Sequence, residues 1–322
     1  MGTVYTIGEA LIDFVPAEVG VELKKVCTFR KAAGGAPANV ASAVARLGGS
    51  SAFIGKLGED GFGDYLVETM VSVGVRTDCI SRTGEANTAL AFVSLKQDGS
   101  REFSFYRNPS ADMLLTPDEI VDGWFRAGDI LHFGSVDLIE APVKYAHIKA
   151  IKAMQAAGGL ISFDPNVRLP LWSNPEGCRQ AILEFMPQSH ILKISEDELE
   201  FITGIRDEAQ ALASLFVGRV THILYTRGAN GSVWYTKQGA VEAEGYRVKA
   251  IDTTGAGDSF IGAVLYQLAQ EGVDPGRLSP EQRKRVLTFA NVTAALVTTR
   301  YGAIPALPTR EEVQDVCAAM EV

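Results

Sequence analysis

Asp252-Thr253-Thr254-Gly255-Ala256-Gly257-Asp258-Ser259-Phe260 is the stretch of this sequence that says most about its fold. It follows the strand-like run Tyr246–Ile251 and opens the helical pattern Ser259–Gln270, which Gly272 closes. Two glycines between a strand and a helix let the backbone approach a ligand, and the first amides of the helix attract negative charge. The pattern predicts an anion hole with the carboxylate of Asp258 beside it. A plain helix start stays open as an alternative, because Gly-x-Gly is common there.

Rival motifs fail on the same residues. A dinucleotide fingerprint needs a third glycine where Phe260 stands, and the sequence has no Gly-Lys-Ser/Thr, His-Glu-x-x-His or Gly-x-Ser-x-Gly. The four histidines, His132, His147, His190 and His222, are scattered, so we expect structural or surface roles for them. An anion hole next to a carboxylate suits phosphoryl transfer, because the hole stabilises the transferred charge while the carboxylate accepts a hydroxyl proton.

A second glycine-rich element, Gly34-Gly35-Ala36-Pro37-Ala38-Asn39, leads into the helical pattern Pro37–Leu47, which Gly48 and Gly49 close. Glycines before a helix let the backbone pack against a ligand such as a sugar, and Asn39 offers a donor and an acceptor to a hydroxyl. A tight turn with no ligand is an equally simple interpretation.

Outward from these elements, strand-length apolar runs alternate with helical patterns. The runs are Val4–Gly8, Ala52–Gly55, Ile130–Phe133, Leu160–Asp164, Ile191–Ile194 and Ile223–Thr226, and the helical segments include Gly63–Val73, Val143–Ala157 and Arg179–Met186. This alternation predicts an α/β fold whose parallel sheet is covered on both faces. Ligands bind at the carboxyl ends of such strands, where we expect Asp13, Gly34, Gly35, Asp164, Lys193, Thr226 and the Thr254–Asp258 loop.

One stretch breaks the alternation. Thr88–Lys96 and Arg101–Arg107 alternate apolar and polar residues around an Asp98-Gly99 turn, which is a strong hairpin signal. The chain from Asp13 to Lys31 is also strand-like and has no helical pattern. Together they predict a small second sheet that acts as a lid.

The composition fits a globular protein and limits its partners. The 322 residues are 47% hydrophobic and 21% charged, with a formal net charge of -9 and no basic block, so nucleic acid is a poor candidate partner. The sequence has no run of about 18 apolar residues, so it predicts no membrane-spanning segment. Cys27, Cys79, Cys178 and Cys317 form no Cys-x-x-Cys pair, and the N-terminus has no signal-peptide pattern. We therefore expect a cytoplasmic protein with reduced, mostly buried thiols.

Gly34–Ala41 and Asp252–Phe260 resemble the two signatures of the ribokinase-like (PfkB) carbohydrate kinases, near the start and near the end of the chain. The chain is similar to fructokinases in particular, at Gly8-Glu9-Ala10-Leu11-Ile12-Asp13-Phe14-Val15-Pro16, Arg101-Glu102-Phe103-Ser104-Phe105-Tyr106-Arg107-Asn108-Pro109-Ser110-Ala111-Asp112-Met113-Leu114-Leu115, Phe163-Asp164-Pro165-Asn166-Val167-Arg168-Leu169-Pro170-Leu171-Trp172 and Gly302-Ala303-Ile304-Pro305-Ala306-Leu307-Pro308. The resemblance covers essentially the whole chain. It implies one kinase domain, 1–322, with a three-layer α/β/α ribokinase-like core, a mainly parallel sheet and a β-lid formed by about 13–35 and 86–110. It also implies a possible homodimer through the lid.

The resemblance implies roles for individual residues. Asp258 would be the catalytic base, Gly255, Ala256 and Gly257 the anion hole for the γ-phosphate, and Arg168 a neighbour of the sugar and phosphoryl path. Asp13, Gly34, Gly35, Asn39, Arg107, Asp164 and Asp258 would hold the sugar. Phe103 and Phe105 share one side of their strand with Arg107, where rings can cover the carbon face of a sugar.

The same resemblance implies cofactor sites. Thr226, Gly228, Gly231 and Asn291 would contact ATP, together with Gly255 and Gly257. Glu196 would organise Mg²⁺ and its waters as the glutamate of the family's Asn-x-x-Glu motif; Lys193 stands in the place of the asparagine and would contact the phosphates instead. A K⁺ ion would lie on Asp252 and the Thr254 carbonyl, near Val297, Arg300 and Gly302, with Ala306 where some relatives have a polar side chain.

The expected activity is transfer of the γ-phosphoryl group of MgATP to O6 of D-fructose. Another kinase of the family, acting on a ribosyl or 2-keto-3-deoxygluconate substrate, stays open as an alternative. A non-catalytic sugar- or nucleotide-binding regulator also stays open, although the intact Gly255–Asp258 loop argues against it. A nicotinamide dehydrogenase is disfavoured by Phe260.

Overall fold

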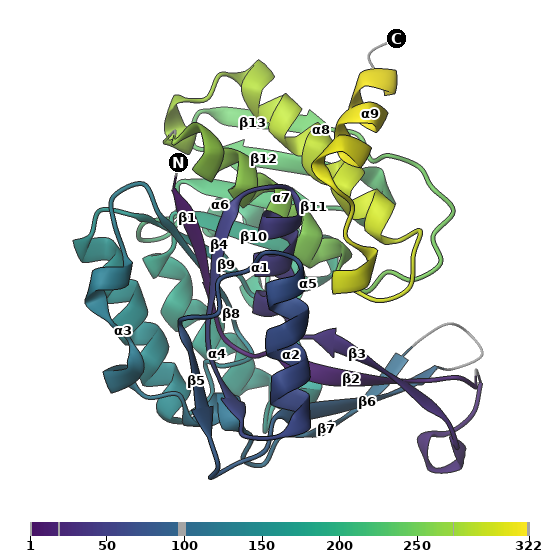
Figure 1. The fold of residues 1–322 in the computed structure, drawn as a ribbon. Helices are drawn as coiled ribbons and strands as arrows, with labels where there is room; N and C mark the ends of the chain where they lie inside the picture. The colour runs from purple at the N-terminus through teal and green to yellow at the C-terminus, as the bar shows by residue number, and fades with distance from the viewer. Residues whose placement is uncertain (1, 19, 96–100, 273, 321–322) are drawn as a thin grey trace.

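The protein is built on two sheets (Figure 1), in a computed structural model that describes residues 2–18, 20–95, 101–272 and 274–320. The large sheet has nine strands in the order β13-β12-β11-β10-β9-β8-β1-β4-β5. Its neighbours are parallel from β5 to β11 and antiparallel at β11–β12 and β12–β13. The strands are β1 (Thr3–Ile7), β4 (Ser50–Gly58), β5 (Ile80–Thr83), β8 (Ile130–Gly134), β9 (Leu160–Asp164), β10 (Ile191–Ser195), β11 (His222–Thr226), β12 (Ser232–Thr236) and β13 (Gly239–Ala243).

Helices cover both faces of the large sheet. They are α1 (Ala36–Arg46), α2 (Gly61–Ser72), α3 (Pro142–Ala156), α4 (Pro175–Phe185), α5 (Glu196–Thr203), α6 (Glu208–Ser214), α7 (Ala256–Glu271), α8 (Pro280–Val297) and α9 (Arg310–Met320). The helices α3 to α6 bury apolar side chains such as Ile151 and Ile182 in one core with Phe133 and Phe163 of the sheet. A second core joins α1, α7, α8 and α9 to Trp234 on the other side. The predicted α/β architecture with a mainly parallel sheet is confirmed as three layers.

Helix starts follow signals that the sequence carries. Asp60 caps α2 by accepting the N–H groups of Phe62 and Gly63 at 3.0 and 2.8 Å, and Ser279 accepts from Gln282 in a capping box at α8. Short 3₁₀ turns occupy Leu23–Lys25, Ala111–Leu114, Pro117–Glu119, Asp122–Trp124, Leu169–Leu171, Met186–Gln188, Gly228–Asn230, Pro275–Arg277 and Ile304–Ala306.

A separate sheet of four strands extends from the edge of the body that carries α2 (Figure 1), in the order β3-β2-β6-β7. Its strands are β2 (Leu11–Pro16), β3 (Phe29–Gly34), β6 (Ala89–Leu95) and β7 (Arg101–Tyr106). The antiparallel pairing of β6 with β7 confirms the predicted hairpin, while its turn residues Asp98 and Gly99 lie outside the described residues. Phe14 of β2 packs against Phe62 of α2, and the centroids of the two rings are 5.7 Å apart.

Two local predictions are wrong. Tyr246–Ile251 forms no strand, and at its end the backbone N–H groups of Ile251 and the following Asp252 both donate to the carbonyl of Thr298 after α8 rather than to a strand. The stretch from Asp13 to Lys31 is not purely strand-like, since a 3₁₀ turn at Leu23–Lys25 separates β2 from β3.

Of the cysteines, Cys79 and Cys178 are buried and Cys27 is exposed. Within the described ranges, no helix is long and apolar enough to span a membrane.

Candidate active site

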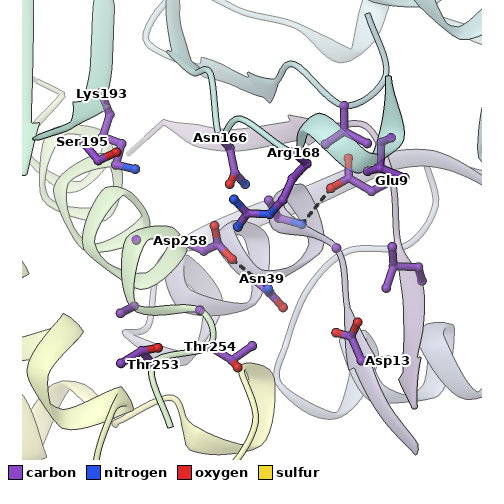
Figure 2. Close-up of a pocket in the computed structure, with 18 of the residues that line it drawn as sticks. Glu9, Asp13, Asn39, Asn166, Arg168, Lys193, Ser195, Thr253, Thr254 and Asp258 are labelled. Carbon is purple, nitrogen blue, oxygen red and sulfur yellow. Dashed lines mark hydrogen bonds between the residues drawn. The ribbon is translucent and has the colours of Figure 1, made fainter. Parts of the chain in front are cut away.

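A cavity of about 430 Å³ lies at the carboxyl end of the large sheet, between that sheet, the start of α7 and the small sheet (Figure 2). The loops after β1, β9 and β10 reach it, as the strand-end rule for α/β sheets requires. Its walls contain Glu9, Leu11, Asp13, Gly35, Ala36, Asn39, Phe105, Val136, Asn166, Arg168, Leu171, Lys193, Ser195, Glu198 and Thr253–Asp258.

The predicted anion hole is the start of α7. Gly255 precedes the helix with φ 76°, and a Cβ there would lie 2.8 Å from the Cβ of Ala303, so both conformation and space require glycine. The helix begins at Ala256, earlier than the sequence pattern indicated, which places Gly257 and Asp258 in its first turn. The amide N–H groups of a first turn have no partner within the helix and can bind an anion.

Asp258 is paired across the cavity wall with Asn39. The Nδ2 of Asn39 donates to its Oδ2 at 2.8 Å, so the two glycine-rich elements of the sequence meet at this carboxylate (Figure 2). Burial raises the pKa of Asp258, while the hydrogen bond from Asn39 and the charges of Arg168 and Lys193 oppose that rise. A carboxylate with a raised pKa is a better proton acceptor, which suits a general base.

Lys193 brings a buried positive charge to the anion hole. Its Nζ lies 3.0 Å from Oδ2 of Asp164, and a Cβ on Gly257 would lie 3.4 Å from that Nζ. Burial raises the pKa of Asp164 to about 6 although Lys193 lowers it. Asp164 is not among the residues that line the cavity; it holds Lys193 and also accepts the Asn166 N–H at 3.1 Å.

The structure does not bring Glu196 to the cavity, where the sequence prediction had placed it; Glu198 takes that position. Glu196 starts α5 and is exposed, whereas Glu198, two residues further along the helix, is buried and lines the cavity. Its Oε2 accepts from the N–H and Oγ of Ser195 at 2.9 and 2.7 Å, and its Oε1 accepts from the Val167 N–H at 2.8 Å. Burial raises the pKa of Glu198, but Lys193 and these donors lower it below its usual range.

The small sheet contributes Asp13 and Phe105 to the cavity walls. Gly34, on the neighbouring strand, has no room for a side chain, because a Cβ there would lie 2.2 Å from Oδ2 of Asp13. Gly35 is equally constrained, with φ 102° and a Cβ position 2.5 Å from the carbonyl oxygen of Glu9. The side chain of Phe103 lies outside the described part of the chain.

Arg107 is absent from the walls of this cavity, contrary to the sequence expectation of direct sugar contact. Its Nε donates to Asp112 at 2.7 Å, its Nη1 to the Val136 carbonyl at 3.4 Å and its Nη2 to Asp137. The side chain is 4% exposed, so the guanidinium is an internal cation. The period of two along a strand says nothing about acids on other elements, such as Asp112 and Asp137, which bind this guanidinium.

Of the residues predicted to contact the nucleotide, Lys193, Gly255 and Gly257 line the cavity, whereas Thr226, Gly228, Gly231 and Asn291 do not. Asn291 donates to the carbonyls of Ala243 and Glu244 at 3.1 and 3.0 Å and accepts from Ser232, so its amide joins α8 to β12 and β13. A Cβ on Gly231 would lie 2.2 Å from the Ala243 carbonyl oxygen. Thr226 ends β11 and Gly228 begins the following turn with φ 52°.

Asp252 fastens the anion-hole loop to the segment after α8. Its Oδ1 accepts from the N–H and Oγ1 of Thr254 at 2.9 and 2.6 Å, and its Oδ2 accepts from the Gly302 N–H at 3.0 Å. Of the other residues predicted for a cation site, Val297 ends α8 and accepts the Arg300 N–H through its carbonyl at 3.2 Å.

Sequence reasoning did not assign Glu9, Asn166, Ser195, Glu198 or Thr253 to the site. A usable signal existed for Ser195 and Glu198, because Ser-x-x-Glu before a helical run is a capping box. Asn166 has φ 43°, and a positive φ in a residue other than glycine is a mark of functional sites that only coordinates reveal.

Comparison with known proteins agrees with this geometry. Residues 1–310 match the model of the pfkB family carbohydrate kinases. The probable fructokinase-2 of Arabidopsis thaliana is 49% identical over 311 residues, which cover 96% of this chain and 93% of that protein.

Solved structures superpose over nearly the whole chain. The fructokinase of Xylella fastidiosa with bound ATP has a TM-score of 0.90 at 38% identity, covering 99% of each chain. The fructokinase of Vibrio cholerae O395, bound to fructose, ADP and a calcium ion, has a TM-score of 0.87 at 34% identity, covering 98% of each chain.

Proposed function

Because the chain belongs to the pfkB family of carbohydrate kinases, we propose that it acts as an ATP-dependent fructokinase, which transfers the γ-phosphoryl group of MgATP to O6 of D-fructose to give fructose 6-phosphate. The observation that carries this proposal is the position of Asp258: a buried carboxylate in the first turn of α7, held by Asn39 and beside Lys193.

Asp258 accepts the proton of the attacking hydroxyl in this mechanism. The raised pKa of the carboxyl group favours proton uptake, and Asn39 holds the carboxylate while keeping one of its oxygens, Oδ1, available. The proton moves from the sugar O6 to Asp258 as the oxygen attacks phosphorus in line and the bond to the ADP oxygen breaks.

The start of α7 and Lys193 stabilise the transferring phosphoryl group. Gly255, Ala256 and Gly257 would form the anion hole for it, although the Ala256 N–H also donates to the Thr253 carbonyl at 3.3 Å. The charge of Lys193 stays in place because Asp164 and Glu198 raise the pKa of its ammonium group although burial lowers it. Arg168 is exposed at the mouth of the cavity, where it can reach the phosphates.

A Mg²⁺ site fits Glu198 better than Glu196. Glu198 is buried at the cavity wall with a lowered pKa, so it presents an ionised carboxylate, and Mg²⁺ usually combines one or two such groups with phosphate oxygens and water. The described residues contain no group of three or more His, Cys, Asp or Glu side chains that would hold a metal by themselves. When bound with ATP, the ion would neutralise phosphate charge.

The sugar would lie between Asp13, Asn39 and the Gly34–Gly35 backbone, under Phe105. In this proposal the single domain 1–322 uses residues 13–35 and 86–110 as a lid that excludes water, and Arg107 supports the lid from inside.

The adenosine part of ATP would lie beyond the anion hole, near Thr226 and Gly228, with Gly231 and Asn291 shaping the backbone there. A K⁺ ion near Asp252, the Thr254 carbonyl, Val297, Arg300 and Gly302 would stabilise the loop that Asp252 already fastens. Pairing of two copies through the lid and a cytoplasmic location are further parts of the proposal, which sedimentation and cell fractionation test.

A panel of sugars with MgATP tests the function directly. ADP release coupled to a reporter enzyme should give the highest kcat/KM for D-fructose, with fructose 6-phosphate as the product. A higher kcat/KM for a ribosyl sugar or 2-keto-3-deoxygluconate would show that the chain is a kinase of the same family with a different sugar substrate. No ADP release with any sugar would contradict a kinase.

A further inference from the structure

Glu9 lines the sugar end of the cavity, and the proposed mechanism does not use it. It lies between β1 and β2, where the chain passes from the large sheet to the small one, and it is 4% exposed. Its Oε1 accepts the backbone N–H of Ala36 at 3.0 Å, directly after the Gly34–Gly35 pair (Figure 2). The side chain therefore touches the backbone that would hold the sugar.

Behind Glu9, acids outnumber the cation they share. Arg107 lies with Asp112, Asp137 and Glu9, and both aspartates are 1% exposed. One guanidinium cannot balance three ionised carboxylates in a buried site, because desolvation penalises each uncompensated charge. At least one of these acids is thus favoured in its neutral form.

The hydrogen bonds show to which acids the Arg107 guanidinium donates. Its donors go to Asp112, Asp137 and the Val136 carbonyl, and Ser110 also donates to Asp112. In the described part of the chain, the carboxyl group of Glu9 accepts from backbone N–H groups only, that of Ala36 and its own, and interacts with Arg107 through charge alone. These donors and the charge of Arg107 do not outweigh the desolvation of the buried carboxyl group, so its neutral form is favoured.

We propose that Glu9 recognises the sugar as a neutral carboxylic acid, donating its O–H to a sugar hydroxyl while its other oxygen keeps the Ala36 N–H. This inference rests on the proposed sugar-kinase function and adds a recognition residue to it. A neutral acid at this point offers both a donor and an acceptor to a polyol, whereas a carboxylate offers acceptors only.

Titration agrees in direction with the geometry. Burial raises the pKa of Glu9 to about 7, against the opposing charge of Arg107. The other charged or titratable groups that face this region are Asp112 on its 3₁₀ turn, Asp137 after β8 and His147 of α3, whose own pKa burial lowers to about 4. Burial also raises the pKa of Asp137, whose Oδ2 has no partner among the described residues, so Asp137 is the competing position for the proton.

Steady-state kinetics across pH provide the first test, with MgATP saturating and D-fructose varied. The wild-type KM for fructose should rise about tenfold between pH 7 and pH 8.5, since only the neutral form binds well. Glu9→Gln keeps a donor and an acceptor but cannot ionise, so it should bind fructose with a near wild-type KM at pH 6.5 and lose this rise. Glu311→Gln, on exposed α9, is the matched control and should keep it.

A rise of KM that Glu9→Gln retains would overturn the proposal. So would a large increase in KM in Glu9→Gln at pH 6.5, because an ionised Glu9 that accepts from the sugar is not mimicked by an amide. If the wild type does not phosphorylate fructose at all, the proposed function fails instead, and the same titration is run with the sugar that the panel selects.

Calorimetry measures the proton itself. Binding of D-fructose at pH 8 in two buffers of different ionisation enthalpy should show uptake of about one proton by the wild type, since the site must be neutral to bind. Uptake should disappear in Glu9→Gln and persist in Asp137→Asn. No uptake by the wild type, or loss of uptake in Asp137→Asn alone, would assign the proton elsewhere and overturn the proposal, and both readings stand even if Glu9→Gln folds poorly.

Discussion

A buried cation with acids around it lies at each end of the cavity, Lys193 in its wall and Arg107 behind Glu9, but the acids have different partners. At the proposed phosphoryl end, the Lys193 group consists of Lys193, Asp164 and Glu198, and Glu198 accepts two backbone N–H groups and a hydroxyl. At the proposed sugar end, the Arg107 group consists of Arg107, Asp112, Asp137 and Glu9, and Glu9 accepts from backbone N–H groups only.

The difference is visible in the direction of the pKa shifts. The pKa of Glu198 falls below its usual range, whereas burial raises that of Glu9 to about 7. Both side chains are almost fully buried, so the difference comes from the charge of Lys193 and then from the Ser195 and Val167 donors, which favour the ionised form of Glu198. Glu198 therefore stays ionised, although burial raises the pKa of Asp164 and Asp258 at the same end, whereas the proposal makes Glu9 a neutral group that recognises hydroxyls.

Removal of the base at the phosphoryl end should have the largest effect. Asp258→Asn keeps the size and the contact with Asn39 but cannot accept a proton, so kcat should fall about 10²–10⁴-fold while the fructose KM changes little. Steady-state kinetics with both substrates varied measure this, with exposed Asp315→Asn as the control. Near wild-type turnover in Asp258→Asn would show that Asp258 is not the general base.

Arg107→Ala should unfold the sugar end rather than slow the chemistry directly. It leaves the acids of the Arg107 group without their cation, and loss of one partner of a buried ion pair costs about 3–5 kcal/mol. Urea unfolding measures this loss, and Arg107→Lys, which keeps the charge, should lose less. A change in the free energy of unfolding within about 0.5 kcal/mol, typical of surface sites, would mean that Arg107 does not stabilise the acids around it.

Gly34→Ala should weaken sugar binding with the protein still folded. The new Cβ would lie 2.2 Å from Oδ2 of Asp13, so that carboxylate must move away from the sugar. We expect a rise of about tenfold in the fructose KM, equivalent to about 1.4 kcal/mol, and an unchanged KM for ATP. Gly123→Ala, where nothing lies within 4 Å of the added Cβ, is the control. An unchanged fructose KM would exclude Asp13 from sugar binding.

The acid side of the pH profile reports on Asp258. The group must be ionised to accept a proton, and burial raises its pKa, so kcat should decline with falling pH earlier than an exposed aspartate would allow. Arg168→Gln removes a charge that lowers this pKa and should move the decline to still higher pH. A shift in the opposite direction would contradict the assigned charge contacts.

Potassium should have the smallest effect. Asp252 links Thr254 to Gly302 through its own hydrogen bonds, so we expect K⁺ to reinforce this loop rather than to form it. We expect a few-fold higher kcat in KCl than in a chloride of a large organic cation at equal ionic strength. Equal rates in the two salts would show that K⁺ does not stabilise the loop and that Asp252 is sufficient.

Much of the fold was predictable because its signals are local. Period-two and helical patterns, Asp60 and Ser279 as caps and Gly272 as a terminator each act within a few residues. The strand prediction for Tyr246–Ile251 failed for the opposite reason: its pattern suits a strand, but pairing needs a neighbouring strand, and the N–H of Ile251 donates to the Thr298 carbonyl instead. Strand propensity depends on tertiary context more than helix propensity does.

The candidate site divides in the same way. Gly255, Asn39 and Asp258 were predictable because glycine-rich turns and first-turn positions fix their geometry, and the structure brings them together at one cavity. Glu196 and Glu198 both belong to an acidic first turn, and only the direction of α5 selects Glu198 as the inward one.

The sequence by itself determined the alternation of strands and helices, the two glycine turns and the placement of Asp258 at a helix start, since each follows from steric and hydrogen-bonding rules over short distances. Tertiary structure alone decided what the charges do. Arg107 became an internal cation, and Glu9 a buried acid that accepts from backbone N–H groups only, when the segments after β7 and β8 and the start of α1 converged. Electrostatic energies depend on burial and on partners far apart in the chain, and no local pattern of residues encodes either.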